Sequence, residues 1–319
     1  MVRETYGPPD VLRLGELPTP SVVDDGVLVR VHAASANAGD WHLLRGTPLP
    51  FRLVAGLIKP KYKVIGSDIA GIVEAVGRNV TQFKRGDEVF GEVSRCGFGA
   101  YAEYVVAREN ALALKPASLS FEEAVSVPTS GCTALQGLRK GNIQSGQKVL
   151  IHGSSGGVGT FAVQIAKALG AEVTGVCSTK NTEMIRALGA DHVVDYARVD
   201  FANLGQKFDL ILAVNGDRSI WEYRRTLAPT GRYVMSGGSN RQLREALFLG
   251  PLLSIGGQKL GNLLAKPSQS DLLVLKDLVE AGKVRPVIER CYQLSEVPAA
   301  IRYLETGHAS GKLVVAIRR

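Results

Sequence analysis

The feature that most constrains the fold is a glycine-rich turn at residues 153–159, which read Gly-Ser-Ser-Gly-Gly-Val-Gly. The apolar run Lys148–His152 before it is typical of a strand, and the spacing of apolar residues in Val158–Leu169 predicts a helix that ends before Gly170. Glycines let the backbone approach a pyrophosphate, and the helix N-terminus supplies free N–H groups and partial positive charge. Glycines also serve turns for conformation alone, but a second strand–helix unit follows at once, which favours a dinucleotide-binding loop.

The order of the predicted elements indicates two kinds of structure. Short strands bounded by Gly, Asp and Pro precede Ser120, which has the features of a helix N-cap, and strands alternate with helices after it. This alternation implies a parallel sheet with helices on both faces. We therefore expect a β-rich domain over residues 1–118, a doubly wound α/β domain over 119–270, and a tail over 271–319 that returns to the first domain.

Composition narrows the class of protein. A length of 319 residues suits two domains. The net charge of +8 is compatible with nucleic acid or an anionic membrane, but the sequence has no long Lys/Arg run, so no nucleic-acid partner is expected. The four scattered cysteines form no Cys-x-x-Cys pair, which argues against a structural zinc site and a disulfide framework. With no signal-peptide pattern and no membrane-spanning apolar run, we expect a cytoplasmic protein.

Several motifs together resemble the quinone oxidoreductase-type medium-chain dehydrogenases/reductases. The glycine turn looks like their cofactor loop, and residues 34–40 (Ala-Ser-Ala-Asn-Ala-Gly-Asp) resemble the segment that reaches the nicotinamide. Further landmarks are residues 6–12, 66–71, 86–89 and 129–134. The resemblance covers nearly the whole chain, although family members usually carry a few more strand residues before Arg3. It implies a Rossmann-type sheet that binds the cofactor and a GroES-like catalytic domain.

The resemblance also implies roles for individual residues. Asn37 and Asp40 would lie beside the nicotinamide ribose and the substrate oxygen, and Thr133 would contact the carboxamide. The alternative for Asn37 and Asp40 is a loop held by Asx hydrogen bonds. Residues that follow predicted strands at the ligand-binding edge of the sheet are added to the cofactor set. The full set is Thr133, Ser155, Gly156, Gly157, Val158, Gly159, Ser178, Thr179, Lys180, Tyr196, Asn215, Gly237 and Gly238.

Zinc-dependent alcohol dehydrogenases are the nearest competing family. They present Cys at the position of Asn37 and a His-Glu pair at Ser67 and Asp68, and catalytic zinc needs about three strong protein ligands. Asn and Ser are poor ligands for this ion, so no metal is expected. His32 and His42 bracket the Asn37 segment as alternative ligands. Because no Cys or acidic partner completes a set with them, ordinary hydrogen bonds are favoured.

The expected reaction is inferred from the lack of an obvious general acid in the sequence. No residue stands out as a strong general acid, which favours quinones or α,β-unsaturated carbonyl compounds, whose negative charge develops on a distal oxygen. We therefore expect hydride transfer from NADPH to such a small molecule. Two alternatives stay open because the glycine loop is common to all three. One is a non-catalytic module that senses NADPH and binds RNA or a partner protein, and the other is a zinc-type alcohol dehydrogenase.

The end of the second predicted strand favours NADPH over NADH. In NAD-specific folds an Asp or Glu about twenty residues past the glycine turn binds the ribose hydroxyls and repels a 2′-phosphate. Residues 173–181 contain no carboxylate, whereas Ser178 and Thr179 offer hydroxyls and Lys180 offers positive charge. Tyr196 resembles the family's Tyr near the same phosphate. In the alternative, Lys180 is a solvated loop residue and Ser178 only caps the next helix.

Two apolar segments have basic residues among or beside them, at residues 49–62 and 243–264. Each is compatible with a lid over the substrate, with contact to a membrane surface, or with packing in a dimer or between domains. Gly and Pro interrupt any continuous amphipathic helix in them, so membrane contact is disfavoured. We expect a homodimer.

Overall fold

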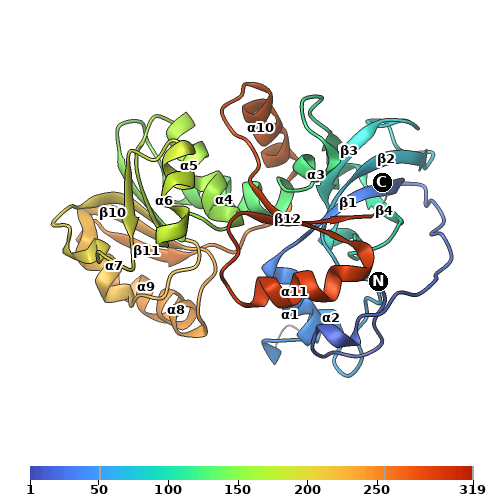
Figure 1. Ribbon diagram of the computed structural model, residues 1–319, viewed down its shortest axis with the longest axis horizontal. Helices are drawn as coiled ribbons and strands as arrows, with labels where there is room; N and C mark the ends of the chain where they lie inside the picture. Colours follow the sequence, from blue (N-terminus) through green and yellow to red (C-terminus); the bar gives the residue numbers. More distant parts are fainter. Residues whose placement is uncertain (50–51, 255, 318–319) are drawn as a thin grey trace. The chain divides into compact units, whose positions relative to one another are not determined.

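The computed structural model describes residues 1–49, 52–254 and 256–317, and the chain divides into two compact units (Figure 1). The first unit contains Met1–Thr129, Pro267–Glu280 and Pro286–Arg319, and the second contains Ser130–Lys266 and Ala281–Arg285. The tail therefore joins the first unit. The divisions lie after residues 129 and 266, where the sequence places them after 118 and 270.

The first unit is built on a seven-stranded sheet in the order β12–β13–β1–β2–β3–β5, with β4 paired to β1. All pairs are antiparallel except β12 with β13. The register sets Ser35 opposite Asp68 and Ala36 opposite Leu313, so the end of β1 meets the beginnings of β2 and β13. The strands are β1 (Gly26–Ala36), β2 (Asp68–Val76), β3 (Glu88–Glu92), β4 (Tyr104–Arg108), β5 (Leu112–Leu114), β12 (Ile288–Gln293) and β13 (Lys312–Ala316).

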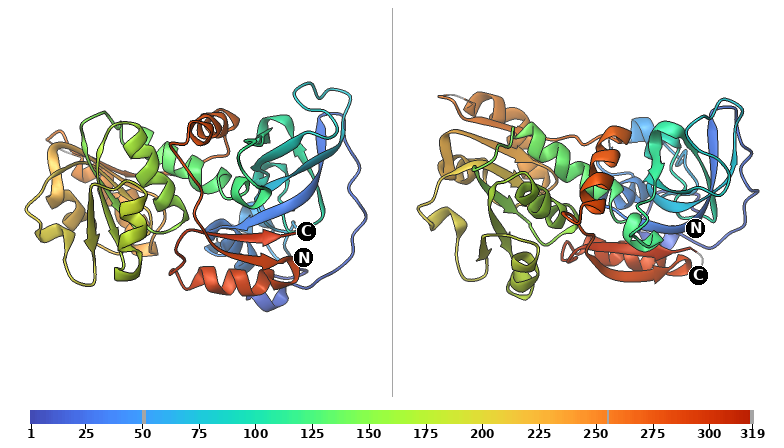
Figure 2. Two further views of the ribbon diagram at one scale, coloured as in Figure 1. Left: turned by 45° about the horizontal axis from the view of Figure 1, so that its top comes forward. Right: turned by 90° about the horizontal axis from the view of Figure 1, so that it is seen from above.

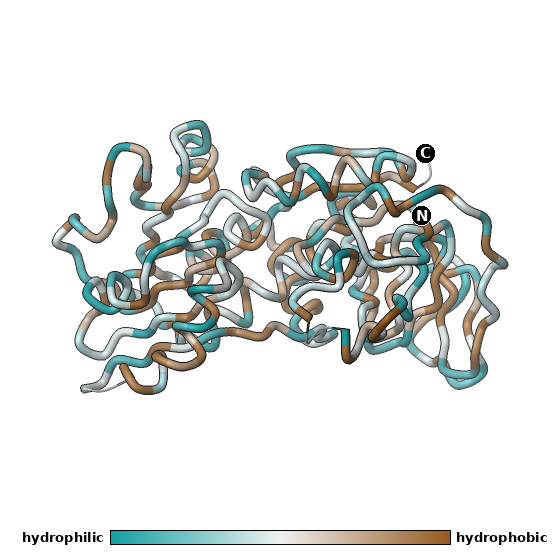
Figure 3. Tube along the Cα trace, turned by 90° about the horizontal axis from the view of Figure 1, so that it is seen from below, coloured by the Kyte–Doolittle hydropathy of each residue, from teal (hydrophilic) through white to brown (hydrophobic). Residues whose placement is uncertain are grey.

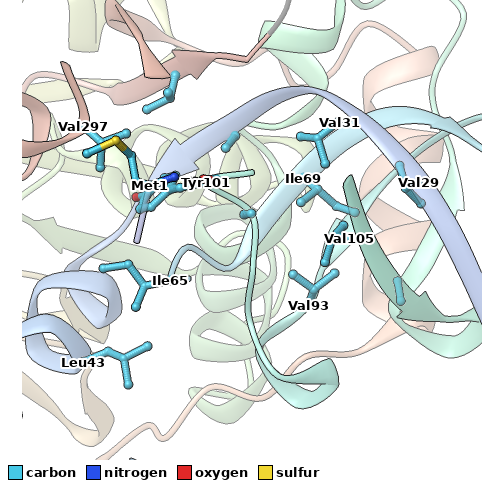
Figure 4. Close-up of a cluster of buried hydrophobic side chains, with 14 of the residues drawn as sticks. Met1, Val29, Val31, Leu43, Ile65, Ile69, Val93, Tyr101, Val105 and Val297 are labelled. Atoms are coloured by element: carbon cyan, nitrogen blue, oxygen red, sulfur yellow. Dashed lines mark hydrogen bonds between the residues drawn. The ribbon is translucent and has the colours of Figure 1, made fainter. Parts of the chain in front are cut away.

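Alternate side chains of these strands build the core of the first unit (Figure 4). Val29 and Val31 from β1, Ile69 from β2 and Val105 from β4 are buried there because a strand turns every second side chain to the same face. The helix after Ser120 packs against β1 and β2, which extends this unit beyond residue 118. Its helices are α1 (Ala38–Arg45), α2 (Arg52–Ala55), α3 (Phe121–Ala124), α10 (Gln269–Glu280) and α11 (Val297–Glu305), with short 3-10 turns at Pro9–Val11, Ser94–Cys96, Glu109–Ala111 and Leu294–Glu296.

The second unit is a parallel sheet in the order β11–β10–β9–β6–β7–β8. Helices of the same unit flank the sheet (Figure 2). The chain order reverses between β6 and β9, and ligands bind at the carboxyl ends of the strands at such a point. The strands are β6 (Lys148–His152), β7 (Glu172–Cys177), β8 (His192–Asp195), β9 (Phe208–Ala213), β10 (Leu227–Met235) and β11 (Lys259–Asn262). The helices are α4 (Pro128–Lys140), which begins at the end of the first unit, α5 (Gly157–Ala168), α6 (Thr182–Ala187), α7 (Ile220–Thr226), α8 (Asn240–Arg244) and α9 (Gly250–Leu253), with a π-helix at Glu245–Leu249 and 3-10 turns at Thr179–Asn181 and Phe201–Asn203.

The apolar segment at residues 243–264 joins the second unit by packing. Ala246, Leu253 and Leu260 are buried, and β11 extends the sheet beside β10, whereas Phe248 and Leu252 stay mostly exposed. Apolar and polar stretches alternate along the chain (Figure 3), and no helix of the described residues is long and apolar enough to cross a membrane. Residues 50 and 51 of the other apolar segment, and residue 255 of this one, lie outside the described residues.

The strand that leads into the glycine turn, β6, ends at a buried histidine. His152 is 6% exposed, its Nδ1 lies 2.7 Å from the Tyr223 hydroxyl oxygen, and its ring meets Phe201 edge-on. Burial lowers the pKa of His152 to about 4, with Asp217 opposing the shift. The imidazole is therefore neutral in the folded protein.

We expect His152 to make the protein sensitive to acid. The unfolded chain binds a proton at this position near pH 6.5 and the folded chain only near pH 4, so its contribution to stability is present above pH 6.5 and lost as the pH falls through that window. The loss amounts to about 3 kcal/mol. The His152→Asn variant keeps a hydrogen-bonding group for Tyr223 but does not titrate. Urea unfolding at pH 7 and pH 4.5 should show a smaller pH difference for the variant, and equal differences would contradict this assignment.

Candidate functional site

The predicted site residues fall into two groups, one in each unit. Asn37 and Asp40 belong to the first unit, and the whole expected cofactor set belongs to the second. Thr133 lies half-buried on α4, while residues 155–159 form the turn before α5 and its first residues. The others follow the carboxyl ends of strands: Ser178, Thr179 and Lys180 after β7, Tyr196 after β8, Asn215 after β9, and Gly237 and Gly238 after β10.

The glycine turn folds back closely on the helix that it starts. Gly153 has a φ of +82°, a left-handed conformation that glycine adopts without strain. A Cβ at Gly159 would lie 2.1 Å from the Gly153 carbonyl oxygen, so no side chain fits there. Gly156, the N-cap of α5, has room, because the nearest atom to a Cβ would be 3.8 Å away. The first N–H groups of α5 lack partners within the helix and form an end that favours an anion.

Other predicted residues gather beside this turn at the point where the strand order reverses. A Cβ at Gly153 would lie 3.1 Å from the backbone nitrogen of Asn215, which places the loops after β6 and β9 in contact. A Cβ at Gly237 would lie 2.7 Å from the Val214 carbonyl oxygen, and one at Gly238 would lie 3.1 Å from that of Gly216. The loop after β9 therefore meets the loops after β6 and β10 backbone to backbone, and the Gln242 side chain packs against Gly238.

A carboxylate of the neighbouring strand lies beside the end of β7. Asp195 ends the neighbouring strand β8, and the register sets it opposite Cys177. Its carboxylate accepts a hydrogen bond from Thr179 Oγ1 at 2.6 Å, which lowers the pKa of Asp195, and it lies 3.4 Å from Arg198 Nε. The Thr179 hydroxyl is thus bound to Asp195. Inspection of one strand could not find Asp195 and Arg198, because they come from the next strand–turn segment along the chain.

In the first unit, Asn37 lies at the end of β1 inside a buried polar cluster. Its side chain is 7% exposed, and its Nδ2 donates to Asp68 Oδ2 at 2.9 Å. Three further contacts of the same nitrogen, to Ser35 O, Ser35 Oγ and Ser67 Oγ, are long at 3.4 Å. One amide hydrogen is therefore well bound, and the other makes only weak contacts.

Asp40 occupies the first turn of the helix α1, whereas the alternative for Asn37 and Asp40 is a loop held by Asx hydrogen bonds. Its Oδ2 accepts the Asn37 backbone N–H at 2.8 Å and the Tyr101 hydroxyl at 3.1 Å, so it caps the helix and binds the core at once. Burial raises the pKa of Asp40 to about 7, and the Asp68 charge acts in the same direction. The carboxyl group of Asp40, 1% exposed, holds the segment around Asn37 in place.

Asp68 joins three parts of the first unit. It is fully buried at the start of β2 and accepts the Ser35 hydroxyl at 2.8 Å on Oδ2. Its Oδ1 accepts the Thr129 hydroxyl at 2.6 Å and the Thr129 backbone N–H at 3.2 Å. A buried carboxylate needs this many donors because its desolvation is otherwise costly.

The cluster also contains a cation that sequence reasoning missed. Lys312 is 3% exposed at the start of β13, and its Nζ donates to Asn37 Oδ1 at 2.6 Å and lies 3.7 Å from Asp68 Oδ2. The signal available was a lysine at the head of the apolar run Leu313–Ala316. That pattern does not show which residues the lysine meets, because Lys312 and Asn37 are 275 positions apart.

Comparison with known proteins identifies the family. A family model described as "Alcohol dehydrogenase GroES-like domain" matches residues 23–117, and one described as "Zinc-binding dehydrogenase" matches residues 188–315. The 2-methylene-furan-3-one reductase of Solanum lycopersicum is 34% identical over 97% of this chain and 76% of its own. The chloroplastic NADPH-dependent alkenal/one oxidoreductase of Arabidopsis thaliana is 32% identical over 98% of this chain and 78% of its own. The solved structure of the quinone oxidoreductase from Coxiella burnetii matches with a TM-score of 0.88 and 34% identity, and the match covers 99% of this chain and 98% of that one.

The chain belongs to the quinone oxidoreductase-like medium-chain dehydrogenases/reductases. This confirms the family, the α/β fold class with a GroES-like domain, and the enzyme class that the sequence predicts. As a member of this family the protein is an oxidoreductase.

The description "zinc-binding" poses the question whether the cluster of this dehydrogenase fits that ion. Its donors are oxygen atoms of Ser, Thr, Asn and Asp, and no group of three or more His, Cys, Asp or Glu side chains among the described residues could hold a metal. The Lys312 ammonium already lies among these oxygens. His32 stacks on Phe121, and the His42 Nδ1, on α1, lies 2.9 Å from the Thr47 carbonyl oxygen. The donor set therefore does not fit zinc.

Two glycine variants separate the structural from the ligand-binding role of the turn. Gly159→Ala places a methyl group against the Gly153 carbonyl and should lower the free energy of unfolding by about 1–3 kcal/mol. Gly156→Ala has room in the free protein and should cost less than about 1 kcal/mol, while its methyl group hinders the approach of a pyrophosphate. Urea unfolding and dinucleotide binding by fluorescence measure both effects. Unchanged dinucleotide affinity in Gly156→Ala would remove this residue from the binding site.

Proposed function

We propose that this dehydrogenase reduces quinones or α,β-unsaturated carbonyl compounds with NADPH and without zinc. The observation that carries the proposal is the buried cluster around Asn37, in which an ammonium group supplies positive charge among oxygen donors that suit zinc poorly. The names of the relatives, an alkenal/one oxidoreductase, a furanone reductase and a quinone oxidoreductase, support this substrate class. The expected homodimer stays a prediction.

Asn37 is the group that meets the substrate in this proposal. When bound, the nicotinamide supplies the hydride, and the chain supplies position and electrostatics. The second amide hydrogen of Asn37, which has only long contacts at 3.4 Å, donates to the carbonyl oxygen of the substrate. In a conjugated acceptor the negative charge develops on this oxygen, where a fixed donor stabilises it. Asp40 acts from behind as the carboxyl group that holds the Asn37 backbone.

The preference for NADPH rests on the charges at the ends of β7 and β8. Lys180 and the exposed Arg198 supply two positive charges there, and the single carboxylate of Asp195 is paired with Arg198. Ser178 adds a hydroxyl group at the N-cap of the following turn. Residues 173–181 contain no carboxylate, and Asp195 of the neighbouring strand adds one. We infer that the balance of charge at this end still favours a 2′-phosphate.

The substrate and the absence of zinc are tested together. The purified enzyme should oxidise NADPH with 9,10-phenanthrenequinone or trans-2-hexenal, should not oxidise ethanol, and should keep its rate in EDTA. The Asn37→Ala variant should lose about 10²-fold or more of its turnover, as expected when an oxyanion donor is removed, with NADPH affinity unchanged. About one zinc per chain by elemental analysis, lost together with activity, would refute the zinc-free mechanism. Turnover of saturated alcohols alone would refute the substrate class.

The cofactor preference has its own test. Lys180→Ala should weaken NADPH binding by roughly ten- to a hundredfold at low salt, because a charge-assisted contact contributes about 1.5–3 kcal/mol. NADH binding should barely change. Lys148→Ala, which removes an exposed lysine from the opposite end of the sheet, is the matched control. Equal loss of NADH and NADPH affinity in Lys180→Ala would show that this strand end does not bind the phosphate.

A further inference from the structure

The buried ammonium of Lys312 belongs to the cluster around Asn37, although Asn37 alone meets the substrate in the proposed reaction. Lys312 lies in an apolar strand at 3% exposure, in contact with Asn37 and Asp68. Burial lowers the pKa of Lys312, and the carboxylates of Asp68 and Asp40 oppose this shift. A lysine is rarely buried unless it is paired. Lys312 is paired with Asp68, the same carboxylate that binds the Asn37 amide, so its charge bears directly on Asn37.

The two charges on either side of Asn37 decide which way its amide points. Lys312 Nζ donates to Oδ1 at 2.6 Å, and Nδ2 donates to the Asp68 carboxylate at 2.9 Å. A reversed amide would set its N–H group against the ammonium and its oxygen against the carboxylate, which would replace two attractive contacts with two repulsive ones. The amide orientation is therefore fixed by charge, and a neutral residue at position 312 would remove half of that constraint.

We propose that Lys312 is a positioning residue that takes the place of a metal ion in this site: its ammonium fixes the Asn37 amide so that the remaining N–H group faces the substrate oxygen. The inference rests on the proposed function, because it assumes that Asn37 meets the substrate. The ammonium withdraws electron density through Oδ1 and so strengthens the N–H group as a donor. It acts without touching the substrate, and it occupies space that a zinc ion would need among Asn37 and Asp68.

The test removes the charge of Lys312 and measures turnover apart from binding. Lys312→Met should lower kcat with 9,10-phenanthrenequinone by about tenfold or more, leave the Kd for NADPH within about twofold, and be partly rescued in Lys312→Arg. If Lys312 acts through Asn37, the double variant Asn37→Ala/Lys312→Met should be no slower than Asn37→Ala alone. Multiplied losses in the double variant, or a Lys312→Met kcat within about twofold of the wild type, would overturn the proposal.

Two further variants separate positioning from stability. Lys312→Met leaves the Asp68 carboxylate unpaired and lowers stability, so Asp68→Asn/Lys312→Met removes both charges and should fold while staying slow. Lys115→Met is the matched control, because Lys115 is another buried lysine of the first unit, paired with Glu88 at 3.0 Å outside the cluster. It should lower the melting temperature and leave kcat unchanged. If Lys115→Met slows turnover as much as Lys312→Met, the effect is structural and the proposal fails.

If the proposed function is wrong, the experiments give a result different from those that overturn the role of Lys312. In that case the wild type reduces neither the quinone nor the enal. Urea unfolding of Asn37→Ala, Lys312→Met and the double variant then still measures whether the two side chains are coupled. Non-additive losses of stability would uphold the contact that fixes the amide, and additive losses would overturn it whether or not the enzyme is active.

Discussion

The first unit of this enzyme depends on how it buries two carboxyl groups and an ammonium group in an apolar core. Each charged group costs free energy unless it is paired and hydrogen-bonded. The partners of Asp68 come from the end of β1, the start of α4 and the start of β13. This explains why the chain must return to its first sheet after the cofactor unit, since Lys312 supplies the positive charge only when β13 lies beside β1.

The second unit depends on a different constraint, the close approach of backbone segments around the glycine turn. Gly153 and Gly159 let the turn after β6 fold against α5, and the loop after β9 meets the same turn. Backbone N–H groups and the helix end therefore contribute directly to the chemistry of this edge. The first unit instead depends on contacts between side chains.

The sequence predicted local features better than distant contacts. The bounds of β6 match the predicted range Lys148–His152, because an apolar run that ends at a glycine turn has one obvious strand. The helix after Asn37 was missed, since Gly39 and Asp40 have weak helix propensity and the helix is fixed by the contacts of Asp40 with Asn37 and Tyr101. Lys312, Thr129 and Asp195 meet their partners only through the fold, and no local pattern in one sequence encodes such pairings.

The proposed role of Lys312 in place of a metal ion depends on the charge balance of the cluster. One ammonium faces Asp68, while Asp40 accepts hydrogen bonds only from N–H and O–H groups among its described contacts, and burial raises its pKa to about 7. The charges of Lys312 and Asp68 offset each other. A zinc ion brings two positive charges and binds an alkoxide directly. In the proposed mechanism a single charge that acts through an amide polarises the carbonyl group less than a zinc ion would, which suits an acceptor whose own conjugation spreads the incoming negative charge.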